Sequence, residues 1–180
     1  MADGMKKVMA SAVLKINTEI SEGYAFKWAT EGMNKLAMRY DSACAINAVP
    51  LEAVIGAGVP YALPTECIGV AKVFNAYGVP IKNYVVDLRN RLILDDSGTY
   101  QIDYLSMPTP ITALSQDPSI NALYWDALGV YVALSHLRSV AAEADYQAML
   151  EEEFWGMAAD ANNRLTERKR TRFIPVRPWR

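Results

Sequence analysis

The chain has 180 residues, of which 52% are hydrophobic and 21% charged, a composition that supports a buried core and excludes an intrinsically disordered protein. Its two cysteines, Cys44 and Cys67, are too few for a disulfide framework or a zinc site and indicate a cytosolic, reducing origin. The net charge of −2 conceals an uneven distribution. Residues 164–180 carry seven basic side chains and one acidic one, against 11 basic and 19 acidic in residues 1–163. An acidic body with a basic tail favours contact between copies or with an acidic partner.

Apolar side chains recur at helical spacing in the first forty residues. This spacing predicts one helix over residues 5–16 and a second helix that ends near Asp41. Either Thr18 or Ser21 opens the second helix, because both residue types cap helix N-termini.

The stretch 45–64 interrupts the helical pattern with three prolines and two glycines. We expect a long loop there, with at most a short strand near Ile46. A loop of this length in a compact domain is usually functional or ordered by a partner.

Residues 67–105 change to the alternating period of β-strands. The expected strands are 67–74, 84–86, 91–94 and 99–104. The sequence Asp-Ser-Gly before residue 99 predicts that the last two strands pair as a hairpin, with Tyr100, Ile102 and Tyr104 on one face. The region therefore predicts a small antiparallel sheet of three or four strands.

Helical spacing returns after the sheet. Asp117 and Pro118 are a strong start signal for a helix that runs to about Ala142. A final helix, through Leu165, is expected to form an antiparallel hairpin with it. The fold class is therefore α+β: a bundle of about four helices, residues 1–167, with a small antiparallel sheet inserted at about 67–105 and an extended basic C-terminal arm, residues 168–180.

The sequence offers little that could support catalysis. His136 is the only histidine. A Ser-His-Asp relay through it is not expected, because neighbouring Ser135 points to a different helix face. We therefore expect His136 to be a half-buried residue of a helix. No Walker loop, dinucleotide fingerprint or calcium-loop spacing occurs. We expect no enzymatic activity, cofactor or metal, and the N-terminus and the apolar stretches predict neither a signal peptide nor a membrane span.

Four stretches of sequence carry a resemblance to a known family. Two are Tyr61, Leu63 and Pro64 leading into the strand 67–74, and the paired strands that end at Tyr104. The others are the run Asp117, Pro118, Ala122, Leu123, Ala127, Leu128, Tyr131, Val132 and Ala133, and the final helix with Tyr146, Met149, Phe154, Met157, Ala158, Ala159, Asp160 and Ala161. In element order, residues 10–165 resemble the adaptors under the portal of tailed bacteriophages, the head–tail connector family that includes tail tubular protein A. In that family, an Asp or Asn usually stands at the second position after the Leu-Pro pair. Glu66 occupies that position here and departs from the pattern.

The resemblance implies a virion protein of the neck or tail, made in the bacterial cytoplasm and assembled as a ring of about a dozen copies. The implied partners are the portal protein, the next connector or tail (nozzle) protein and other copies of the chain, with DNA passing non-specifically through the ring. The family's C-terminal segment reaches the portal, which implies that role for the basic arm here. The expected portal-binding residues are Arg168, Lys169, Arg170, Arg172, Phe173, Ile174, Arg177, Trp179 and Arg180.

Three other interpretations stay open. The chain could be a monomeric tail-completion or neck protein of the same particle. It could instead be a small DNA-binding helical protein, because cations interleaved with aromatics contact phosphates and stack on bases. The tail could also be a flexible, solubilising end.

Overall fold

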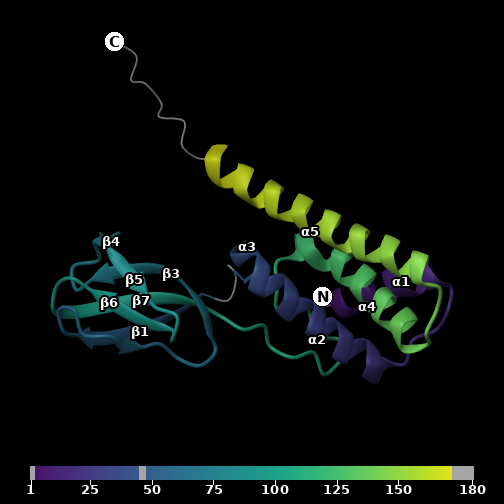
Figure 1. Cartoon of the computed structure of the whole chain (residues 1–180), viewed down its shortest axis with the longest axis horizontal. Helices are drawn as coiled ribbons and strands as arrows, with labels where there is room; N and C mark the ends of the chain where they lie inside the picture. The colour runs from purple at the N-terminus through teal and green to yellow at the C-terminus, as the bar shows by residue number, and fades with distance from the viewer. Residues whose placement is uncertain (1–2, 45–47, 172–180) are drawn as a thin grey trace, which may run out of the picture.

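The chain folds into a helical module and a sheet module that lie side by side (Figure 1). The computed structural model describes residues 3–44 and 48–171, with only the backbone described for residues 168–171. Helices from both ends of the sequence build the helical module, and strands between residues 48 and 106 build the sheet module. This arrangement confirms the mixed α+β class.

The helical module contains two long N-terminal and two long C-terminal helices. Its elements are α1 (Gly4–Ile16), α2 (Glu22–Arg39), α3 (Asp41–Cys44), the 3₁₀ helix η2 (Ala122–Tyr124), α4 (Trp125–Ser139) and α5 (Ala144–Thr171). The two N-terminal helices agree with the sequence prediction, and Ser21 is the N-cap residue of α2. The short helix α3, which leads toward the sheet module, was not predicted because four residues are too few to show a period.

Helix α4 is the centre of the helical core. Every residue from Ala127 to Ser135 is buried, and α1, α2 and α5 pack around it. A helix that is apolar on all sides can only be stable when it is surrounded. Arg138 is hydrogen-bonded to Glu151 near one end, and Asp126 and Asp160 line the same pocket near the other, which confirms that α4 and α5 run antiparallel.

The prediction that Asp117 and Pro118 start the helix was wrong. The residues between β7 and η2 follow an irregular path, α4 begins at Trp125, and it ends at Ser139 rather than near residue 142. The Asp117 carboxylate instead accepts a hydrogen bond from the Gly4 backbone N–H at 2.6 Å. Asp117 therefore does satisfy a helix N-terminus, but that of α1, 113 residues earlier in the chain.

The sheet module consists of two antiparallel sheets. The strands are β1 (Ala48–Ile55), β2 (Tyr61–Ala62), β3 (Cys67–Asn75), β4 (Pro80–Ile81), β5 (Tyr84–Val86), β6 (Arg91–Leu94) and β7 (Gly98–Ser106). One sheet has the order β1-β7-β3-β4 and the other β2-β6-β5. The insertion is thus longer than the predicted 67–105, because β1 and β2 lie in the stretch that we expected to be a loop. The short strand expected near Ile46 lies outside the described residues.

The predicted hairpin between β6 and β7 was also wrong. The two strands are consecutive, but β6 pairs with β2 and β5, whereas β7 lies between β1 and β3. The turn between them therefore carries the chain from one sheet to the other. Tyr100, Ile102 and Tyr104 do share one buried face, as predicted, and that face forms the core between the two sheets.

The contact between the modules is small. The helical core and the sheet core are separate clusters, and between them lies a third cluster of Ala37, Cys44 and Leu105, with Ile68 packed against it. Leu105 of β7 thus closes onto the end of α2 and onto α3.

The C-terminal boundary of the helical module differs from the prediction. Helix α5 continues to Thr171, so residues 168–171, which we assigned to an extended arm, are helical. Lys, Arg and Thr do not break a helix, and the first proline of the tail is Pro175. Residues 172–180 lie outside the described residues.

Candidate docking surfaces

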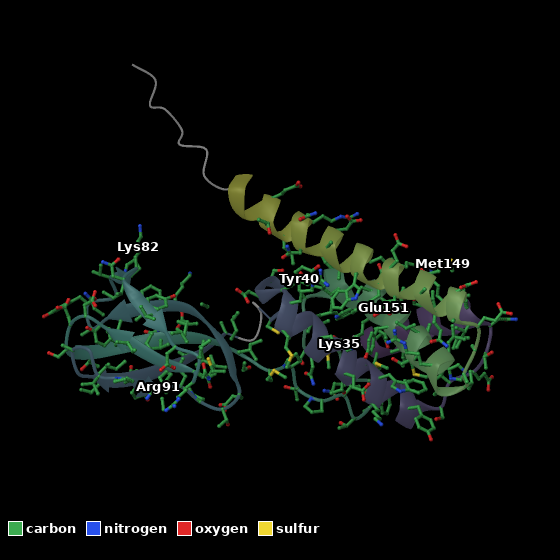
Figure 2. All side chains as sticks on the ribbon, in the orientation of Figure 1. Lys35, Tyr40, Lys82, Arg91, Met149 and Glu151 are labelled. Atoms are coloured by element: carbon green, nitrogen blue, oxygen red, sulfur yellow. The ribbon has the colours of Figure 1, made fainter. Side chains whose placement is uncertain are left out.

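Three contacts fix the first half of α5 to the helical module. Lys15 of α1 forms an ion pair with Glu153. Arg138 of α4 forms another with Glu151 at 2.6 Å. The Tyr146 hydroxyl donates to the Lys15 carbonyl at 2.6 Å. Glu151 and Met149 lie on the α5 segment that carries these contacts (Figure 2).

A part-buried polar network fixes α5 further along. Ser42 of α3 donates to the Asn162 side-chain oxygen at 2.7 Å and lies 2.6 Å from the Tyr124 hydroxyl. A serine hydroxyl has one proton, so the Tyr124 hydroxyl must be the donor to Ser42. Burial raises the pKa of Tyr124, which keeps its hydroxyl protonated and able to donate. The network ties α3, η2 and α5 together at the side of the bundle that faces the sheet module.

Replacing Tyr124 with phenylalanine is expected to lower the free energy of unfolding by about 1–2 kcal/mol, because it leaves a part-buried Ser42 hydroxyl with one fewer partner. Chemical denaturation followed by circular dichroism measures the change. Tyr77→Phe is the matched control, since the Tyr77 side chain is 90% exposed. An equal loss in both variants would show that the network contributes no stability.

Beyond Asn162, α5 extends nine residues to Thr171, about 14 Å at the usual rise of a helix. Its end lies past α4, above α3 and on the side of the sheet module (Figure 1). Arg164 is exposed there and lines a small pocket of about 120 Å³ with Asp160, Met157 and Leu123. Of the predicted portal-binding residues, Arg168, Lys169 and Arg170 lie in the last turns of α5, and those from Arg172 to Arg180 lie outside the described residues.

A second candidate surface is the end of the sheet module, formed by the turns 56–60, 76–79 and 95–97 and here called the sheet tip. Strand register places these turns together, because Ile55 of β1 pairs with Gly98 and Asn75 of β3 pairs with Tyr100. Four apolar side chains on or beside these turns are exposed: Val54, Val59, Tyr77 and Val79. Apolar residues gathered at a surface often mark a protein contact.

Sequence analysis did not find this surface. The only available signal was the presence of valines and a tyrosine between turn-forming glycines and prolines, and it does not show that three distant turns meet. Lys82, next to β4, is also exposed and points away from the module (Figure 2).

A third feature is a pocket of about 450 Å³ at the junction of the modules, here called the junction pocket. Its lining comes from α3 and from strands β1, β3 and β7: Asp41, Ala48, Val70, Ala71, Lys72, Asp103 and Leu105. The pocket lies on the outer face of the four-stranded sheet, because Asp103 alternates with the inward-facing Ile102 and Tyr104.

The perturbed titratable groups have structural causes. Burial, followed by the nearby Asp41 carboxylate, raises the pKa of Cys44 to about 11, and burial is also the main cause that raises the pKa of Cys67. The pKa of Glu66 is lowered by a hydrogen bond from its own backbone and then by one from the Tyr104 hydroxyl at 3.0 Å. Both thiols are therefore protonated near neutral pH, and the Glu66 carboxylate, just before β3, accepts a hydrogen bond from Tyr104 of β7.

His136 is half-buried in α4, as predicted, with its ring edge-on to Trp28 at 5.9 Å between centroids. Within residues 3–44 and 48–171, no group of three His, Cys, Asp or Glu side chains is arranged to hold a metal ion. In the same part of the chain, none of the helices combines the length and apolar composition needed to cross a bilayer.

Comparison with known proteins does not identify a family for this chain. No protein-family model matches the chain, and no curated protein matches it. The assignment of function therefore depends on the residues and surfaces described above.

Proposed function

We propose that the chain is a structural virion protein of a tailed bacteriophage, a head-to-tail adaptor that docks under the portal as a ring and joins it to the tail. In this proposal, residues 172–180 form an extended arm that contacts the portal, and DNA passes through the ring. The sequence resemblance to head–tail connectors supports the proposal, and so does one structural observation: α5 extends well past the network around Asn162 and presents the basic end of the chain.

The composition of the arm suits docking. Trp and Arg are the residues most enriched among those that dominate binding energy at interfaces, and the arm contains Trp179 together with three arginines. Pro175 and Pro178 reduce the entropy lost when the arm orders. Because α5 is fixed at both ends of its packed region, its last turns can position the arm without further ordering of the bundle.

The acidic body is compatible with a DNA channel. A basic lumen would bind phosphates and retain DNA, whereas residues 1–163 carry more acidic than basic side chains and would let DNA slide. The apolar sheet tip then supplies a surface for neighbouring copies or the downstream tail protein. The same charge distribution argues against the alternative of a duplex-binding protein.

Truncation after Thr171 tests the role of the arm. The shortened chain is expected to bind portal-containing, DNA-filled heads about a hundredfold more weakly, because it lacks the Trp and Arg anchors, each capable of about 2 kcal/mol or more. Binding is measured by co-sedimentation with the heads, and joining by the yield of infectious particles. Light scattering of the intact protein, alone and with portal, separates a ring former from a monomeric neck protein.

The matched control is a chain of full length in which residues 172–180 are in scrambled order, so that charge and composition are unchanged. If the scrambled chain joins heads as well as the natural one, docking by specific anchors is wrong. If the truncated chain still yields infectious particles, the arm has no essential role. Binding of duplex DNA at low salt, lost on adding salt and without affinity for portal, would instead support the DNA-binding alternative.

A further inference from the structure

The junction pocket is built by segments far apart in the sequence. Strand register aligns Ala48 of β1 with Leu105 of β7, and Asp103 of β7 with Lys72 of β3, so the outer face of the sheet forms its floor. Asp41, the first residue of α3, contributes from the helical module. A volume of about 450 Å³ lies in the range of pockets that hold small ligands or anchoring side chains.

The chemistry of the junction pocket favours a segment that is both cationic and apolar. Val70, Leu105 and two alanines supply apolar surface, and two carboxylates outnumber the single lysine. A carboxylate beside an apolar surface suits an arginine, whose planar head pairs with the carboxylate while its stem packs on apolar groups.

The basic and aromatic segment 172–180 follows the end of α5, and α5 contacts α3 beside that pocket. Ser42, next to Asp41, is hydrogen-bonded to Asn162 of α5, and from Asn162 the helix continues about 14 Å to Thr171. The nine residues that follow can span about 30 Å when extended. The segment 172–180 is therefore long enough to return from the end of α5 to Asp41 in the same molecule.

We propose that, in the unassembled protein, residues 172–180 dock into the junction pocket of their own chain, with arginines near Asp41 and Asp103 and aromatic side chains on the apolar floor. A tethered segment reaches an effective concentration in the millimolar range, so weak contacts suffice for docking. The same residues are then covered until a partner that binds them more tightly displaces them. This inference concerns the free protein and holds whether or not the partner is a portal.

Trypsin cleavage after Arg172 tests the docking in the full-length protein, with mass spectrometry to identify the cut. The double variant Asp41→Asn and Asp103→Asn is expected to be cut about fivefold faster than the natural protein at low salt, since two partly exposed ion pairs are lost. Trp179→Ala is expected to give a similar increase without any change in the folded modules. Raising the salt should reduce the difference, because exposed ion pairs are screened.

The matched control is Asp95→Asn with Asp96→Asn at the sheet tip, which changes the net charge equally and should leave the rate unchanged. Equal rates in the natural protein, the junction variant and Trp179→Ala would overturn the proposal. Protection that rises with protein concentration would also overturn it, because the segment would then be docking on a neighbouring copy. Portal binding by the junction variant is measured separately, so a failed docking test does not decide the adaptor function.

Discussion

Replacing Phe154 with alanine should lower the free energy of unfolding by about 3–5 kcal/mol, the range for deleting a large buried aromatic side chain. Phe154 is 1% exposed and lies between two other rings, with centroids 5.1 Å from Tyr131 of α4 and 4.5 Å from Trp155. The substitution removes a buried aromatic contact between α5 and the central helix. Because domains are stable by only about 5–15 kcal/mol in total, a large part of the stability would be lost.

Met149→Ala on the same helix is the control for this effect. Met149 is 53% exposed, so its removal should change stability by no more than about 0.5 kcal/mol. Denaturation monitored by circular dichroism gives both values. If the two variants lose the same stability, α5 is not held by the packing around Phe154, and its position over the bundle would need another explanation.

The helices were predictable because their information is local. The apolar stripes of α1, α2 and α5 repeat within each helix, and every repeat shows which side is buried. The same reasoning found β3, β5, β6 and β7, and it placed Tyr100, Ile102 and Tyr104 on one face. It overlooked β1, because Pro50 and the glycines that follow Ile55 are typical of loops, although a proline is tolerated in an edge strand.

Pairing between elements could not be predicted in the same way. The turn between β6 and β7 has the residues of a hairpin, yet the strands belong to different sheets, because β1 and β3 occupy both edges of β7. Asp117 has the properties of a helix cap, but nothing local shows that it caps α1 rather than the next helix. Long-range contacts decide both outcomes, and a single sequence contains no direct record of them.

The candidate surfaces differ in the same way, in whether local sequence or long-range contacts define them. Sequence composition indicates the basic tail as a docking segment, since charge and aromatic content are local properties. The sheet tip and the junction pocket require knowledge of which turns and strands meet. Asp41 and Asp103 are separated by 62 positions and become one site only when α3 closes over the end of β7.

Replacing Gly129 with leucine should also be strongly destabilising, by about 3 kcal/mol, the upper part of the range for overpacking a core. Gly129 of α4 faces α1 at close range. A Cβ atom there would lie 2.7 Å from the Ser11 Oγ, 2.8 Å from the Ser11 Cβ and 3.2 Å from the Val8 carbonyl oxygen. The backbone of α1 would have to move away from the central helix, which opens the core that both helices share.

Gly156→Leu supplies the matched comparison, because Gly156 lies within α5 and a Cβ there would meet nothing within 4 Å. That variant should gain about 0.5–1 kcal/mol from the better helix propensity of leucine, so the same substitution should have opposite signs at the two positions. Adding Ser11→Gly to the Gly129→Leu variant removes the side chain that makes two of the three close approaches and should restore part of the loss. If Gly129→Leu proves as harmless as Gly156→Leu, α1 does not pack on α4 at this distance, and the helical core must be arranged differently from the one described.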